Sequence, residues 1–206
     1  MVINWYGEGC FKVQTGGLAL LTDPFESSTG LTPSRGKVDV ILKTLTPYPV
    51  PPAETSDEHI VWGGGEYAIK GIEIKGIGLN KESEEKYFKT AYTVKAEDIT
   101  LGFLGHISES PDPSVLDTLK EIDILFIPAG GKPFIEIDAA TKLIKQIEPK
   151  IIVAAFFKIP GLKRSGEDYK DLAKELGQKS EPEEKLTIRK KEITEQKGIR
   201  LVILKV

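Results

Sequence analysis

Short apolar runs separated by glycine-rich turns occupy the first hundred residues, and this spacing restricts that part of the chain to β-structure. The runs at residues 2–6, 10–14 and 18–22 are divided by Gly7-Glu8-Gly9 and Thr15-Gly16-Gly17. Because glycine adopts the backbone angles of tight turns without steric cost, we predict three strands, the second and third forming a hairpin. We predict further strands at residues 38–42, 59–62, 67–70, 72–77, 90–95 and 99–104, the last two as another hairpin.

A proline-rich segment, Thr46–Pro52, interrupts these runs. Proline lacks an N–H donor and holds the chain extended. We therefore expect this segment to form neither a helix interior nor a central strand.

After residue 110 the pattern changes to alternating helices and strands. Pro111–Ser114 opens a short helix, Asp138 is the expected N-cap of a second helix, and residues 166–176 form a third. Strands are expected at residues 123–128, 151–157, 186–190 and 199–205, and the charge-rich residues 180–185 and 192–197 are interpreted as solvated turns. The sequence thus predicts a single α/β domain spanning residues 1–206.

Composition excludes several classes of function. The chain has 206 residues, with 28 basic against 31 acidic side chains and a net charge of −3, so nothing favours nucleic acid as a partner. Cys10 is the single cysteine, so neither an intrachain disulfide nor a cysteine-rich zinc site can form. No apolar run approaches the ~18 residues that span a bilayer, and the start lacks the features of a secretory signal. We expect a soluble, cytoplasmic protein without membrane partners.

The order of several motifs resembles the small metallo-β-lactamase-fold hydrolases of the metal-dependent hydrolase type. Their order covers nearly the whole chain, which makes the resemblance specific for fold. The matching segments are Trp5–Phe11 (W-x-G-H-S-x-F in the family), Leu21–Phe25, Val38–Thr44, Gly65–Ile74, Phe103–His106, Asp123–Gly131 and Pro149–Lys158. The resemblance implies a four-layer αβ/βα sandwich with two mixed, mostly antiparallel sheets.

The same resemblance implies a metal loop, H-x-H-x-D-H, whose imidazoles and carboxylate bind zinc, manganese or iron and leave a position for water. At the matching positions this chain has side chains that cannot donate a lone pair: Leu45, Pro47, Pro49 and Val50. Phe103 and Phe156 replace two later histidines, His106 replaces the bridging aspartate, and Glu8 replaces the histidine of the opening motif.

The histidine count makes this loss independent of small alignment errors. A dinuclear site of this kind needs about five histidines and two aspartates, and a mononuclear one about three protein ligands. The chain has two histidines, His59 and His106, and His59 falls far from the matching positions. We therefore predict no catalytic, cofactor-binding or metal residues and no cofactor.

Individual residues near the former site leave alternatives open. His106 is either a hydrogen-bonded residue at a strand end or a metal ligand beside Glu8 and Asp23; we favour the first. Glu8 is expected to be an exposed turn residue, Asp23 to brace a turn, and Cys10 to be buried and unreactive. Phe103 and Phe156 either fill the former cleft or wall an apolar pocket, and we favour filling.

Three functions are compatible with these observations. The first is a catalytically inactive protein that binds a small ligand or a protein partner. The second is a metal-dependent hydrolase with a relocated site at Glu8, Asp23 and His106. The third is a homo-oligomeric scaffold.

Overall fold

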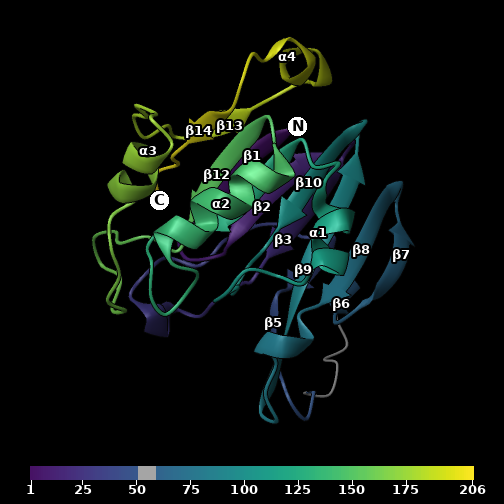
Figure 1. The fold of residues 1–206 in the computed structure, drawn as a ribbon. Coiled ribbons are helices and arrows are strands. Elements are labelled where there is room, and N and C mark those ends of the chain that lie inside the picture. Colours follow the sequence, from purple (N-terminus) through teal and green to yellow (C-terminus); the bar gives the residue numbers. More distant parts are fainter. Residues whose placement is uncertain (51–58) are drawn as a thin grey trace.

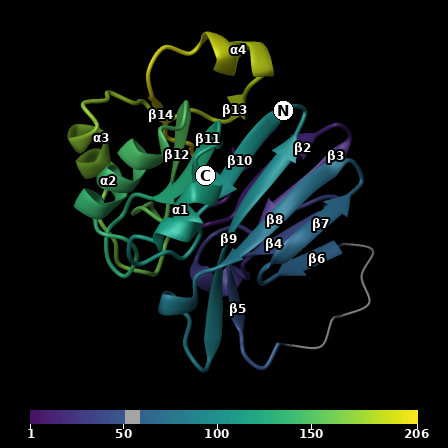
Figure 2. The same cartoon turned by 45° about the vertical axis from the view of Figure 1, so that its right-hand side comes forward.

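The computed structural model describes residues 1–50 and 59–206, whose strands form two sheets packed face to face (Figures 1 and 2). The first sheet has the order β13-β1-β2-β3-β4-β6. Its early strands pair antiparallel, whereas β3, β4 and β6 run parallel. These strands are β1 (Val2–Trp5), β2 (Phe11–Thr15), β3 (Leu18–Thr22), β4 (Val40–Lys43), β6 (His59–Trp62) and β13 (Leu186–Thr187).

The second sheet has the order β14-β12-β11-β10-β9-β8-β7, and β5 (Leu45–Pro47) pairs antiparallel with β9. The pairs among β7, β8, β9 and β10 are antiparallel, whereas β10, β11, β12 and β14 are parallel. The strands are β7 (Gly65–Ile69), β8 (Ile72–Gly78), β9 (Tyr87–Ala96), β10 (Ile99–Phe103), β11 (Ile124–Pro128), β12 (Ile151–Ala155) and β14 (Arg200–Val202).

Helices α1 (Pro113–Leu119) and α2 (Ile137–Ile147) connect the parallel strands and cover the outer face of the second sheet (Figures 1 and 2). Parallel strands require such crossover connections. Helix α2 buries the face that carries Ala140, Leu143, Ile144 and Ile147, and α3 (Lys170–Glu175) packs beside it. Helix α4 (Lys190–Glu195) lies between β13 and β14, and two 3₁₀ turns are η1 (Ser27–Thr29) and η2 (Asn80–Glu82).

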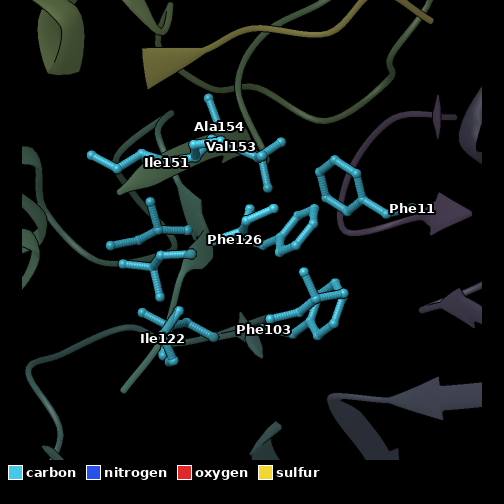
Figure 3. Close-up of a cluster of buried hydrophobic side chains, with 14 of the residues drawn as sticks. Phe11, Phe103, Ile122, Phe126, Ile151, Val153 and Ala154 are labelled. Atoms are coloured by element: carbon cyan, nitrogen blue, oxygen red, sulfur yellow. The ribbon is translucent and has the colours of Figure 1, made fainter. Parts of the chain in front are cut away.

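The core lies between the sheets, where aromatic rings from both sheets meet. Phe11 of β2 packs edge-on against Phe126 of β11, with ring centroids 4.8 Å apart. Phe103 of β10 stacks on Phe126 at 4.3 Å (Figure 3). All three rings are buried, and burial of such a side chain contributes about 1.5–3 kcal/mol.

The predicted α/β architecture with two mixed sheets is confirmed. The two expected hairpins are present as β2–β3 and β9–β10. Thr46 and Pro47 lie in β5, which makes antiparallel pairs with β9, and Pro51 and Pro52 lie outside the described residues. Among the described residues, no helix has the length and apolar character that a bilayer crossing requires.

Three local predictions were wrong. The N-cap of α2 is Glu136, and Asp138 lies inside the first turn, where its carboxylate faces the positive end of the helix. Residues 190–195 form α4 instead of a turn, because the Glu192 side chain accepts a hydrogen bond from the Arg189 N–H and Ile193 is buried. The last two strands are shorter than expected, and they lie in different sheets.

Candidate functional site

The residues that match the family's site gather where several strands of both sheets end. Glu8 follows β1, Asp23 follows β3, His106 follows β10 and Phe156 follows β12. Contacts connect them across the chain: the Phe156 N–H donates to the Glu8 carbonyl at 3.2 Å, and the Asp23 N–H donates to the Leu42 carbonyl at 2.9 Å. The fold therefore brings Glu8, Asp23, His106 and Phe156 together, as the motif order requires.

The segment that matches the metal loop does not join these four residues but pairs with strand β9. Leu45 pairs with Lys89 and Pro47 pairs with Tyr87 on the neighbouring strand β9. Pro47 and Pro49 are exposed, and Leu45 and Val50 are half-buried. None of these four residues lines the small cavity beside Asp23, whereas Phe103 and Phe156 do.

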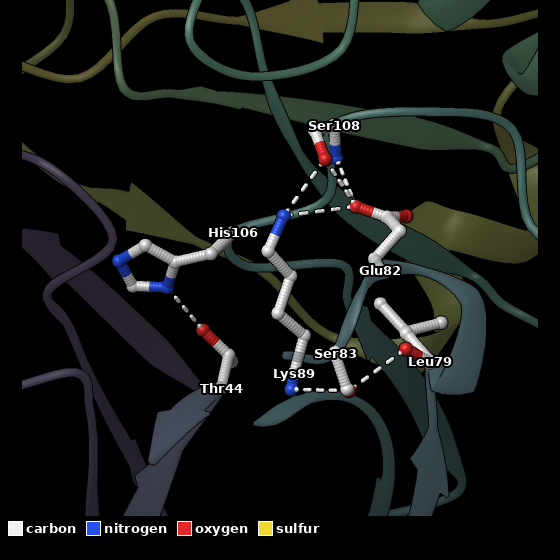
Figure 4. Close-up of polar contacts among 7 residues, drawn as sticks. All are labelled: Thr44, Leu79, Glu82, Ser83, Lys89, His106 and Ser108. Carbon is white, nitrogen blue, oxygen red and sulfur yellow. Dashed lines mark hydrogen bonds and ion pairs between the residues drawn. The ribbon is translucent and has the colours of Figure 1, made fainter. Parts of the chain in front are cut away.

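A hydrogen-bonded chain links Asp23, Thr44 and His106. The Asp23 carboxylate accepts from the Thr44 N–H at 2.7 Å and from the Thr44 hydroxyl at 2.6 Å. The same hydroxyl oxygen lies 2.8 Å from His106 Nδ1 (Figure 4). Because the hydroxyl proton is directed at Asp23, Nδ1 of a neutral His106 is the donor and Nε2 carries the lone pair.

Burial shifts the pKa values of both ionisable ends of this chain towards their neutral forms. Removal of the Asp23 carboxyl from water raises its pKa, although His106 and the Thr44 hydrogen bonds act in the opposite direction. Burial likewise lowers the pKa of His106, and the nearby Asp23 partly offsets this. The site therefore holds an uncharged imidazole against a carboxyl that binds its proton more tightly than an exposed one.

Aromatic rings fill the space around this chain. Phe156 packs against His106, with ring centroids 4.9 Å apart, and against Phe134 at 4.3 Å. Phe103 and Phe126 stack on each other and line the same small cavity as Asp23. The cavity that remains among Asp23, Thr44 and the phenylalanines has a volume of about 10 Å³, which is about the space of one water molecule.

Glu8 is not an exposed turn residue, because an ion pair holds it at the site. The Arg164 guanidinium donates to both Glu8 carboxylate oxygens, through Nε at 3.0 Å and Nη2 at 3.1 Å. Nη2 also donates to the Phe156 carbonyl at 2.9 Å, and the guanidinium carbon lies 4.9 Å from the Phe134 ring centroid. Only 16% of the Glu8 side chain and 23% of the Arg164 side chain are exposed.

Arg164 is the residue that sequence reasoning missed. It lies 156 positions from Glu8, in the loop between β12 and α3, and no periodicity or motif marks it. The single available signal was Glu8 itself, a carboxylate in place of a histidine. A carboxylate that is buried in a site requires a positively charged partner.

A second buried ion pair, between Lys89 and Glu82, lies near His106 (Figure 4). The Lys89 ammonium donates to Glu82 at 3.0 Å and to the Ser108 hydroxyl at 2.8 Å, and Ser108 also donates to Glu82. The side chains of Lys89 and Glu82 are 10% and 4% exposed. Both Lys89 and Arg164 act to lower the pKa of His106, so two cations are close enough to influence the imidazole.

Three residues of this site have a backbone conformation that L-amino acids rarely adopt. The φ angles of Glu8, Asp23 and Phe156 are 51°, 38° and 54°. Such left-handed residues cost about 1–2 kcal/mol each and gather at sites where the path of the chain is fixed by function. Gly9 permits the arrangement, since a Cβ there would lie 2.5 Å from the Phe156 ring.

These residues do not fit a hydrolytic metal ion. Across residues 1–50 and 59–206, no three His, Cys, Asp or Glu side chains are grouped as metal ligands would be. Thr44 occupies His106 Nδ1 and bonds both oxygens of Asp23, while Arg164 occupies Glu8. Cys10 is buried, and burial together with the Asp23 carboxylate raises its pKa to about 12, so a thiolate ligand is disfavoured too.

Comparison with known proteins agrees with this architecture. A family model described as the β-lactamase superfamily domain matches residues 2–155. The structure is similar, over all of both chains, to the crystal structure of a metallo-β-lactamase superfamily protein from Thermotoga maritima, with a TM-score of 0.80 and 22% identity. The chain therefore belongs to the metallo-β-lactamase superfamily.

Within the superfamily, the sequence is similar to proteins of the group called UPF0173. The relative from Pyrococcus furiosus is 27% identical over 176 residues, which cover 74% of this chain and 81% of the relative. A relative from Methanopyrus kandleri, named a UPF0173 metal-dependent hydrolase, is 22% identical over 86% of this chain and 93% of its own length. The chain thus has the fold of proteins that are named metal-dependent hydrolases.

Proposed function

We propose that this chain is a catalytically inactive member of the superfamily, which has lost its hydrolytic metal site and acts by binding a small ligand or a protein partner. One observation carries the proposal: Phe156 takes a matching ligand position, is buried, and packs its ring on His106. A hydrocarbon ring offers no lone pair to a cation, and it closes the space that an attacking water and a substrate would need.

The charges around the site support the same proposal. Glu8 is balanced by Arg164, and Glu82 is balanced by Lys89, in pairs of good geometry. Lys89 and Arg164 act to lower the pKa of His106, and Asp23 and Glu8 act in the opposite direction. A divalent ion entering this site would have to displace hydrogen bonds that Glu8 and Asp23 already make.

The alternative of a relocated metal site at Glu8, Asp23 and His106 is less well supported. Thr44 links Asp23 to His106, because its hydroxyl group bonds both an Asp23 carboxylate oxygen and His106 Nδ1. These atoms are therefore already hydrogen-bonded within the protein. Glu8 is turned to Arg164. These side chains are hydrogen-bonded to Thr44 or Arg164, and this arrangement differs from an open coordination site.

Metal analysis tests the proposal. Tag-free protein is purified without chelator, its zinc, manganese and iron are measured by mass spectrometry, and it is assayed against phosphodiester, lactone and ester substrates. We expect substoichiometric metal and no turnover above buffer, with or without added metal. Stoichiometric metal together with turnover that a chelator abolishes would refute the proposal.

Two histidine variants locate any metal that is found. His106→Gln removes the imidazole at the site, and His59→Gln removes the other imidazole, on the strand β6. Metal that both variants retain equally, without turnover, is bound elsewhere and leaves the proposal standing. Metal that only His106→Gln loses, with turnover, contradicts it.

A further inference from the structure

The loop between β12 and α3 leaves the body of the protein and returns to it at one point. The Lys158 N–H donates to the Glu167 carbonyl at 2.9 Å, and the Glu167 N–H donates to the Gly130 carbonyl at 3.0 Å. Ile159, next to this base, packs half-buried against the core. Loops whose two ends meet in this way are compact and are frequently functional. We call residues 158–167 the strap.

Few contacts hold the middle of the strap. None of residues 158–167 is buried, whereas every residue from 151 to 157 is. Within the described part of the chain, a single main-chain hydrogen bond joins residues 159–166 to another segment, from the Lys163 N–H to the Thr29 carbonyl at 3.2 Å. Segments with few buried side chains and few main-chain bonds open at a lower free energy than the rest of a protein. We therefore expect the strap to open while the strands beside it stay folded.

The side chain of Arg164 ties the middle of the strap to the site. Its guanidinium donates to both Glu8 carboxylate oxygens and to the Phe156 carbonyl, and it lies over the Phe134 ring. Bidentate, charge-assisted bonds of this kind fix the geometry of a contact. The two side chains are 23% and 16% exposed, so water can replace these bonds when the pair separates. The pair therefore has the properties of a contact that breaks and forms again.

The imidazole of His106 lies beside this ion pair. Its ring packs against those of Phe134 and Phe156. Arg164 contacts both of these phenylalanines, through the ring of the first and the carbonyl of the second. His106 Nδ1 is bonded to Thr44, whereas Nε2, on the other side of the ring in Figure 4, makes no hydrogen bond to another residue in the ranges 1–50 and 59–206. Because 22% of the side chain is exposed, departure of Arg164 widens an existing path to Nε2.

We propose that the strap opens and closes the path to His106 Nε2, and that the ion pair of Arg164 with Glu8 is the latch that keeps it closed. In the open state the base at Lys158 and Glu167 stays bonded while Arg164 leaves Glu8. The lone pair on Nε2 can then accept a hydrogen bond from a molecule outside the chain. This inference concerns access to the imidazole and does not rest on the proposed loss of the metal site, so its test is separate.

Chemical labelling of the two histidines tests the proposal. Diethyl pyrocarbonate modifies uncharged imidazoles, and the rates for His106 and His59 are followed by mass spectrometry of their peptides at about pH 8, where an ordinary imidazole is uncharged. His59 is exposed on β6 and serves as the internal reference. We expect His106 to react more slowly than His59, and Glu8→Gln to raise the His106 rate about fivefold, as loss of a partly exposed ion pair allows. Arg164→Met keeps the length of the side chain without its charge and should give the same increase.

A matched control uses another pair of the same chemistry, in which Arg200 donates to Glu183 at 2.6 Å. Glu183→Gln removes one charge from that pair, and we expect the labelling of His106 to stay unchanged. Hydrogen exchange supplies a second measurement: the amides of Leu162 and Lys163 should exchange faster in both latch variants, while those of β12 should not. Circular dichroism and the melting temperature verify that each variant is folded.

Three results would overturn the proposal. The first is a His106 labelling rate that neither latch variant changes. The second is an equal increase in Glu183→Gln, which would reflect general destabilisation. The third is faster labelling of His106 without faster exchange in the strap, which would show that the imidazole is uncovered without any opening of the loop.

Discussion

Replacement of Phe156 tests whether its ring closes the former cleft. The side chain is buried and packs on His106, on Phe134 and on the backbone at Gly9. Truncation of such a phenylalanine to alanine costs about 3–5 kcal/mol, because lost burial and a new cavity add together. We expect the free energy of unfolding to fall by that amount in Phe156→Ala.

The left-handed backbone at this position gives a sharper expectation. Phe156 has φ of 54°, so alanine keeps the conformational strain of about 1–2 kcal/mol, whereas glycine relieves it. Glycine also has more conformational entropy in the unfolded state, which lowers stability by about 0.5–1 kcal/mol relative to alanine. The difference leaves Phe156→Gly at least as stable as Phe156→Ala, by up to about 1.5 kcal/mol, the reverse of the usual order.

Phe157 supplies the matched control. It is equally buried and packs on Trp5 with ring centroids 4.6 Å apart, but it is not among the residues of positive φ. There, glycine should be less stable than alanine. Urea denaturation followed by circular dichroism measures all four variants at a common m-value. A loss of less than about 0.5 kcal/mol in Phe156→Ala, as at a surface position, would refute the filled site.

Three further outcomes are expected. A double-mutant cycle of Glu8→Gln and Arg164→Ala in urea should give a coupling of about 1 kcal/mol, because the pair is bidentate but partly exposed; additive losses would show that the two residues do not interact. Burial lowers the pKa of His106, so the folded state disfavours its charged form, and stability that is present above pH 6.5 falls as the pH decreases through and below that value. Melting temperatures of His106→Asn should therefore depend less steeply on pH in that window, and an unchanged slope would contradict the assignment. Finally, a thiol reagent at neutral pH should label Cys10 only in denaturant, since burial raises its pKa to about 12; rapid labelling of native protein would contradict its burial.

The fold could be predicted from sequence because its signals are local and repeat along the chain. Glycine turns gave the hairpin of β2 and β3, and the apolar stripe on α2 gave its buried face. The errors occurred where one residue decided the outcome. Buried Ile193 and the Glu192 hydrogen bond made a helix of a charged segment, and Glu136 took the capping position from Asp138.

The site was predictable only in part. Motif order singled out Glu8, Asp23, His106 and Phe156, and the fold brings them together because each follows a strand whose end lies at the same place. Arg164 could not be found, because its contact with Glu8 spans 156 positions and comes from an irregular loop. The route of β5 was also unforeseen, since a strand pairing between Pro47 and Tyr87 is decided by the tertiary neighbour and not by local propensity.

The left-handed residues at Glu8, Asp23 and Phe156 bear on protein engineering. Their backbone path is fixed by hydrogen bonds between main-chain groups, such as those from Phe156 to Glu8 and from Asp23 to Leu42. A histidine introduced at position 156 would find the backbone already held in the left-handed conformation that Phe156 now adopts. The backbone at these positions is thus preformed, and metal-binding side chains can be introduced into it one substitution at a time.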